Sequence, residues 1–268
     1  MILNNLSILP FYAVTSANPT PLEHEKWWVY GNIYPLLTPG IPPIMVQGSM
    51  TTMELWRLGP NGQGGTMVTY INPDGTKVID GKTYTYSAGT VSALSPGRYE
   101  LQTRIDNVFA RSDIFTIFPS AIANAYLKLE WWDDSDFVMD GGAVVYTNGG
   151  GTNVYKNVLY FATDLAKPDY TFTEDSENRD GYFFPIKQLS AKRYRFAIFA
   201  PEYLLDVMRL IRMSDHIQIT YRGQVFYPDT FLMTPTWEKN GDLASVICEF
   251  ETNTVAKKIG RLITPQNI

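Results

Sequence analysis

The fold is decided by residues 179–251, a stretch whose first half reads RDGYFFPIKQLSAKRYRFAIFAPEYLLDVMRLIR (179–212). Apolar residues alternate with charged or small ones along 193–198, which is typical of a strand that buries one face and exposes the other. The hydrophobic period then lengthens to about 3.6 residues, the period of an α-helix. The stretch therefore predicts a strand that leads directly into a helix.

Two residues mark the start of this helix. Pro201 has no amide proton to lose at the first helical position, and Glu202 lies favourably at the positive end of the helix dipole. One apolar stripe follows along successive turns and consists of Leu204, Val207, Met208 and Ile211. We therefore predict a single helix over residues 201–213.

Strand patterns return after the helix. Arg222-Gly223 can turn the chain, and Asn240-Gly241 is a strong hairpin signal, because both central residues of a type I′ turn need positive φ. The strand that follows places Cys248 on an apolar face, so we interpret this single cysteine as a small buried hydrophobe rather than a reactive thiol. The stretch as a whole predicts a β-rich domain with one packed helix.

The composition agrees with a globular, β-rich protein. Of the 268 residues, 45% are hydrophobic and 14% are aromatic, and Tyr and Phe favour half-buried pleated surfaces. The net charge of -5 argues against nonspecific nucleic-acid binding, which needs a basic surface. No apolar run approaches the roughly 18 residues that cross a bilayer. No Lys or Arg precedes Lys26, so the charged head of a secretory signal is missing. We expect neither nucleic acid nor membrane as a partner.

The chain divides where its pattern breaks. Short candidate strands with a turn about every eight to twelve residues over 41–118 indicate a small, immunoglobulin-like β-sandwich. Within it, 108–118 is interpreted as one strand. The predicted parts are an extended N-terminal arm (1–40), the sandwich (41–118), a linker (119–126), a second β-rich domain with the helix (127–260) and a C-terminal tail (261–268).

The arm is crowded with aromatic side chains, namely Trp27, Trp28, Tyr30 and Tyr34. No single short strand can bury all of them on one side, so the arm must pack on the body of the chain or on a neighbouring subunit. The sequence leaves these two alternatives open.

No set of residues has the spacing of a catalytic, cofactor or metal site. The Asp133, Asp134 and Asp136 group lacks the glycine and glutamate of a calcium loop, so we interpret it as a solvated turn. The acidic cluster from Glu174 to Asp180 is interpreted as a polar loop, or as an intersubunit contact to the basic run Lys192, Arg193 and Arg195. A carboxylate hydrolase and a carbohydrate-binding sandwich remain as alternatives.

Most of the chain resembles a family of structural proteins of tailed bacteriophages and prophages, including crAss-like phages of gut bacteria. The segments that carry the resemblance are KWWVYGNIYPL (26–36), LKLEWWD (127–133), YKNVLYFATDLAKPDY (155–170), ENRDGYFFPIKQ (177–188), APEYLLDVMRLIR (200–212) and FETNTVAKKIG (250–260). The order of loop, long strand, helix and hairpin meander in 179–251 is similar to the belt domain of distal tail proteins. Here that domain is C-terminal to an immunoglobulin-like module, which departs from the family pattern.

The resemblance implies a non-enzymatic virion subunit of the tail, baseplate or neck, without cofactors, that forms a ring with copies of itself, commonly six, and docks other virion proteins. It implies assembly in the cytoplasm of the bacterial host and residence in the virion. A carbohydrate-binding adhesin is the alternative function. The expected interface residues are Trp27, Trp28, Tyr30, Tyr34, Arg179, Asp180, Tyr182, Phe183, Phe184, Arg193 and Arg195.

Overall fold

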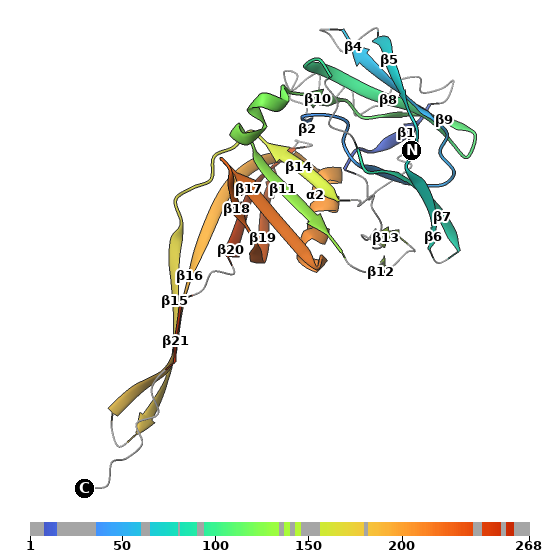
Figure 1. Ribbon diagram of the computed structural model, residues 1–268. Coiled ribbons are helices and arrows are strands. Elements are labelled where there is room, and N and C mark those ends of the chain that lie inside the picture. The colour runs from blue at the N-terminus through green and yellow to red at the C-terminus, as the bar shows by residue number, and fades with distance from the viewer. Residues whose placement is uncertain are drawn as a thin grey trace.

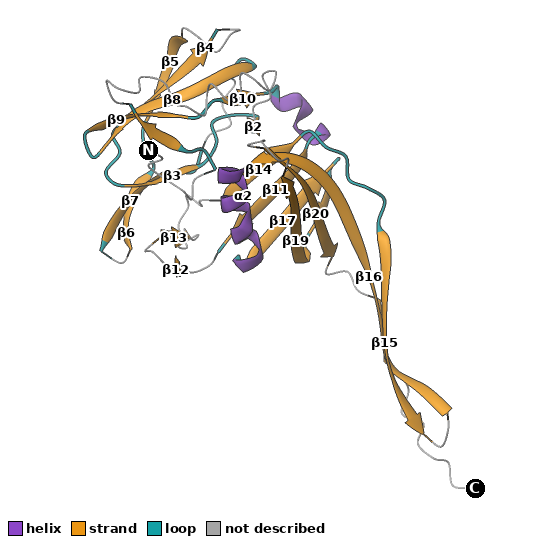
Figure 2. Cartoon of the chain, turned by 180° about the vertical axis from the view of Figure 1, so that it is seen from behind, coloured by secondary structure: helices purple, strands orange, loops and turns teal. Residues whose placement is uncertain are grey.

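The protein is mainly β, as predicted, with several antiparallel sheets and one packed helix (Figure 2). The computed structural model describes residues 8–14, 36–59, 65–79, 81–89, 94–133, 137–139, 143–145, 156–179, 182–237, 243–252 and 256–259. The Asn240-Gly241 turn lies outside these residues.

Two sheets share one core in the N-terminal half. Inward residues of both sheets, such as Val46, Leu55 and Leu101, belong to a single buried cluster. The first sheet contains β1 (Phe11–Ala13), β9 (Val108–Ser112), β8 (Gly97–Ile105) and β10 (Phe115–Ile117), and β4 (Met53–Leu58) and β5 (Gly65–Ile71) branch from β8. The second contains β3 (Ile44–Gln47), β7 (Lys82–Ser87) and β6 (Gly75–Ile79).

The predicted single strand over 108–118 is two strands, because the chain turns at Asp113. The buried carboxylate of Asp113 accepts the N–H of Ile114 at 2.8 Å and the hydroxyl of Tyr203 at 3.2 Å. These bonds satisfy an otherwise costly buried carboxylate at the break between β9 and β10, which pair with different segments of β8. Since Tyr203 belongs to the helix, the same contact ties that helix to the N-terminal half.

The first sheet continues into the C-terminal half. β2 (Leu37–Thr38) pairs in parallel with β10 and antiparallel with β14 (Asn157–Phe161), and thus bridges the two halves. Beyond β14 follow β11 (Leu127–Trp132), β17 (His216–Tyr221) and β18 (Gln224–Phe226). The predicted linker contains a 3-10 helix, η1 (Ser120–Ala125), and a separate two-stranded sheet is formed by β12 (Phe137–Met139) and β13 (Ala143–Val145).

The described parts of the predicted N-terminal arm belong to the body. β1 pairs with β9, and Ile8, Leu9 and Phe11 are fully buried in the common core. β2 is the bridge between the two halves. Of the two alternatives left open by the sequence, these parts of the arm therefore pack on the body of their own chain.

A second large sheet contains β15 (Asp169–Arg179), β16 (Tyr182–Pro201), β20 (Leu243–Thr252) and β19 (Pro228–Trp237), with β21 (Ala256–Ile259) paired to the far part of β16. The β15–β16 hairpin extends away from the body (Figure 1). At about 3.4 Å per residue, the 20 residues of β16 span roughly 65 Å.

The acidic segment interpreted as a polar loop is part of this hairpin. Glu174, Asp175 and Glu177 are strand residues of β15, paired with Gln188, Lys187 and Phe184 of β16. Acidic residues disfavour strands intrinsically, but pairing with a neighbouring strand overrides that weak preference. The interpretation as a loop was therefore wrong for these three residues.

The predicted helix is present, but it begins at Glu202, one residue later than predicted, because Pro201 is extended and ends β16. α2 (Glu202–Met208) continues as the 3-10 helix η2 (Arg209–Met213), and the whole apolar stripe is buried. It shares one core cluster with residues of β11, β17, β16 and β20, so the helix joins the two large sheets. The predicted turn at Arg222-Gly223 is confirmed, since both residues have positive φ between β17 and β18.

Candidate functional site: the outer face and open edge of the long hairpin

The expected interface residues fall into three groups. Trp27, Trp28, Tyr30, Tyr34 and Asp180 lie outside the described residues. Arg179 pairs with Tyr182 at the far end of the hairpin, and Phe183 and Phe184 follow on β16. Arg193 and Arg195 lie further along β16, where its pairing with β15 ends at Asp169 and its pairing with β20 begins. The structure therefore places the described members along one hairpin.

Arg193 and Arg195 form ion pairs within their own chain. Arg193 donates to Oε1 of Glu251 from Nε at 3.0 Å and from Nη2 at 2.8 Å. Arg195 contacts Glu249 at 2.5 Å and Asp169 at 3.4 Å. The bond to Glu251 is the main cause of a raised pKa for Arg193. The carboxylates opposite these arginines thus lie in neighbouring strands of their own chain. The expected intersubunit contact between the basic run and the Glu174 to Asp180 cluster stays a prediction.

An apolar patch lies on the same face of this sheet. Phe199 of β16, Ile247 of β20 and Leu232 of β19 are exposed, and we call these three residues the outer patch. The pairing register places them on a diagonal across three strands, with Arg195, Glu249 and Leu232 in one row. Diagonal neighbours in a sheet are close enough for large side chains to touch. The outer face therefore combines apolar residues with a row of charges.

Two aromatic residues are exposed on the hairpin itself. Tyr170 is 70% exposed and Phe172 is 65% exposed, on neighbouring positions of one side of β15. The amino group of Lys192 lies 5.9 Å from the centre of the Tyr170 ring, at the outer limit of a cation–π contact. The register places both rings on the face of the sheet that covers the core further along β16. At the rings themselves, no core lies beneath the sheet.

The edge strand of the hairpin is open. Among the described strands, β15 pairs only with β16, along all 11 of its residues. The opposite edge of the sheet, β19, contains Pro228 and Pro235, which remove donors and discourage a further strand. β15 has no proline. Its unpaired backbone groups can accept a strand from another chain.

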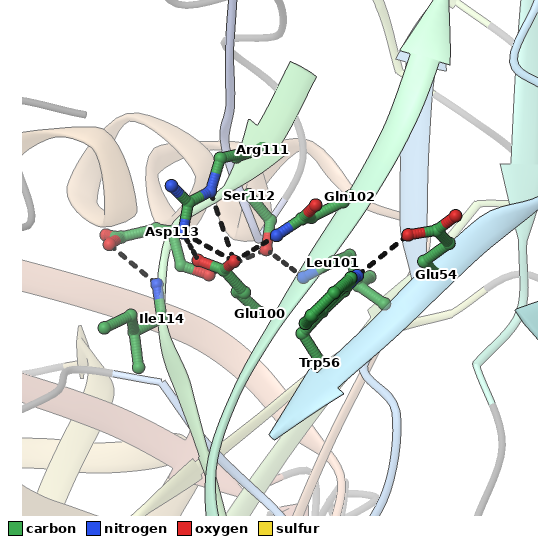
Figure 3. Close-up of polar contacts among 9 residues, drawn as sticks. All are labelled: Glu54, Trp56, Glu100, Leu101, Gln102, Arg111, Ser112, Asp113 and Ile114. Atoms are coloured by element: carbon green, nitrogen blue, oxygen red, sulfur yellow. Dashed lines mark hydrogen bonds and ion pairs between the residues drawn. The ribbon is translucent and has the colours of Figure 1, made fainter. Parts of the chain in front are cut away.

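A buried polar cluster in the N-terminal half is the strongest rival site (Figure 3). Glu100 is 1% exposed, and Arg111 donates to both of its carboxylate oxygens at 2.6 Å. Gln102 donates to Oε1 of the same carboxylate, also at 2.6 Å. Because in-chain donors hold both oxygens, the geometry is that of a structural bridge between β8 and β9. The hydrophobic pattern of the sequence does not indicate which charged residues form such a buried pair.

Asp133 is buried, so the interpretation of a solvated turn was wrong at this residue. It accepts the backbone N–H of Asp215 at 2.8 Å and the hydroxyl of Ser214 at 3.4 Å. Burial raises the pKa of Asp133 above its usual value of 3.8. Asp134 and Asp136 lie outside the described residues. Ser214 and Asp215 border a polar cavity of about 340 Å³ that Arg212 and Asp229 also line.

The described part of the chain contains no group of three His, Cys, Asp or Glu side chains placed to hold a metal ion. Cys248 is fully buried, as predicted, and desolvation raises the pKa of its thiol to about 12. None of the described helices has the length and apolar content needed to cross a bilayer.

Comparison with known proteins adds no relative. No protein-family model and no curated protein matches this sequence. The function must therefore be argued from the hairpin, its exposed face and its open edge.

Proposed function

We propose that the protein is a non-enzymatic structural subunit of a bacteriophage virion, which assembles with copies of itself into a ring of the tail, baseplate or neck and docks neighbouring virion proteins there. The observation that carries this proposal is the β15–β16 hairpin, which extends from the body with an unpaired edge and two exposed aromatic rings.

The extended β15–β16 hairpin adds little stability to a monomer. It is a narrow ribbon of β15 and β16, widened only by the four residues of β21. A narrow ribbon without a core is marginally stable in water, and exposed aromatic side chains on it favour aggregation. Tyr170 and Phe172 gain only about a third of their possible burial from their own chain. A neighbouring copy that covers them would recover that burial and would complete the open edge of β15.

The outer face of the sheet has the composition of an interface. The outer patch supplies apolar area, and the ion pairs of Arg193 and Arg195 border it with satisfied charges. Protein interfaces combine an apolar centre with a polar rim in this manner. Two of the residues expected from the sequence thus lie beside an exposed patch that the sequence pattern did not single out.

The finer fold assignment is part of the same proposal. We assign residues 41–118 to an immunoglobulin-like sandwich, supported by the two sheets around one core, and residues 127–260 to a belt domain like that of distal tail proteins. The support for the second assignment is the order of long strand, helix and β19–β20 hairpin. The family resemblance of the sequence segments supports the proposal that the subunit resides in the virion, after assembly in the host cytoplasm.

Electron microscopy of the purified full-length chain, together with light scattering, tests this function. The proposal predicts ring-shaped particles of uniform subunit number at micromolar concentrations. A monomer at every concentration that binds glycans on an array would overturn it in favour of the adhesin. Hydrolysis of a glycan panel that is lost in Asp133→Asn would overturn the non-enzymatic assignment.

A further inference from the structure

We propose that neighbouring copies join through the far part of the hairpin, where the acidic edge strand β15 of one copy pairs in parallel with the basic edge strand β21 of the next. This inference rests on the proposed function, since it names the contact through which the ring would close. It is carried by the charges and register of three strands that lie side by side. We call their shared segment, residues 172–175, 187–190 and 256–259, the blade.

The two edges of the blade carry opposite charge. β15 contains four acidic residues, Asp169, Glu174, Asp175 and Glu177, against one basic residue, Arg179. β21 reads AKKI, with Lys257 and Lys258 and no acidic residue. β16 lies between these edges and pairs with both. A copy placed beside another in the same orientation therefore brings an acidic edge against a basic one.

The register aligns these charges row by row. Glu174 pairs with Gln188, and Gln188 pairs with Lys258, so the three form one row across the blade. The adjacent row contains Thr173, Leu189 and Lys257. If the next copy continues the rows without an offset, Glu174 meets Lys258 directly, and Asp175 is a diagonal neighbour of Lys257. Cross-strand pairs of opposite charge stabilise a sheet, and like charges destabilise it.

The strand direction follows from the topology. β15 and β21 are both antiparallel to β16, so they run parallel to each other. A head-to-tail contact between copies of the same orientation joins different edges and therefore pairs β15 with β21 in parallel, which sheets accept. Each pair joined in this way still has one free edge on either side, so further copies can add until the rotation between copies closes the series into a ring.

The competing arrangement is a two-fold contact of β15 with β15. It is antiparallel and closes as a dimer, because the same edge is used twice. It would also bring the acidic residues of two β15 strands together, at Glu174 and Asp175 above all. Like charges across a strand pair are unfavourable, so the charge pattern favours the head-to-tail arrangement.

Disulfide trapping tests the proposed row. The full-length variant Glu174→Cys with Lys258→Cys should form a ladder of covalent oligomers under mild oxidation, visible on a non-reducing gel. The two positions in one chain are two strands apart, about 9.5 Å, which is too far for a bond within the chain. Cys248 does not compete, since it is fully buried. Products that stop at the dimer, or no cross-link from a chain that still assembles, would overturn the proposal.

Charge reversal provides a second, independent measurement. Glu174→Lys with Asp175→Lys, and separately Lys257→Glu with Lys258→Glu, should each raise the concentration needed for assembly about tenfold or more, because two attractive pairs become repulsive. Mixing the two variants should restore assembly, with an even number of subunits. Assembly of the Lys257→Glu, Lys258→Glu chain like the wild type would favour the two-fold contact and overturn the proposal.

These experiments distinguish an incorrect blade contact from an incorrect ring function. If both charge-reversed variants still form rings, the blade contact is wrong, but the proposal of a ring-forming subunit remains. If the wild-type chain is a monomer at every concentration, both the proposed function and the blade contact are wrong. Circular dichroism of each variant shows that loss of assembly is not loss of fold.

Discussion

Replacing the two exposed rings of the hairpin, in the variant Tyr170→Thr with Phe172→Thr, should weaken self-association about 100-fold without changing the stability of the single chain. An aromatic side chain offers about 150–250 Å² of surface. The exposed fractions of 70% and 65% leave about 130 Å² of each ring open. If a neighbouring copy covers half of that, the two rings contribute about 3 kcal/mol at about 25 cal/mol per Å², or roughly 100-fold in the association constant.

The stability of the monomer should remain within about 0.5 kcal/mol of the wild type, because exposed side chains without partners contribute little and threonine keeps a good strand propensity. Sedimentation velocity over a concentration series measures the association, and urea unfolding at low concentration measures the stability. Tyr70→Thr on β5 is the matched control, since Tyr70 is exposed to a similar degree, 61%, but lies on the body. Unchanged association in the hairpin variant, or an equal loss in Tyr70→Thr, would refute the reasoning.

Three further outcomes follow from the body of the protein. Arg111→Met should destabilise the fold by about 3 kcal/mol in urea unfolding, because it leaves the buried Glu100 carboxylate without its cation. Adding Glu100→Met should recover more than half of that loss. Equal losses in the single and the double variant would contradict the pairing. The raised pKa of Asp133 means that the folded chain holds this proton more tightly than the unfolded chain. Its stabilisation is therefore complete below pH 3.8 and is lost as the pH rises through the folded pKa. Unfolding free energies of Asp133→Asn should lack this decline above pH 3.8, and identical pH profiles for variant and wild type would count against it. Cys248, with its pKa raised to about 12, should resist iodoacetamide at pH 8 until the chain unfolds, and rapid labelling of the native protein would disprove its burial.

The parts of the fold that the sequence predicted are those in which burial imposes a period. The stripe of Leu204, Val207 and Met208 predicted the helix, and alternation along 193–198 predicted a strand that is part of β16, because each pattern faces one core. The chemistry of Arg222-Gly223 likewise predicted a turn that needs positive φ. These are local signals, and local structure follows them.

The remaining features depend on contacts between distant residues. β15 lacks apolar alternation beyond Phe172 because no core lies beneath the hairpin there, so its acidic residues resembled a loop. Asp133 lies next to Ser214 and Asp215, 81 and 82 positions away, so its burial has no local signature. The same holds for the bridge of β2 between two sheets and for the diagonal of the outer patch, both of which follow from strand order and register.

Sedimentation equilibrium of the wild-type chain tests the central claim most directly, because it measures the mass in solution without reference to shape. The account predicts a species whose mass is a fixed multiple of 30.3 kDa and that dissociates to single chains on dilution or at high salt. A mass of 30.3 kDa at the highest soluble concentration would contradict it.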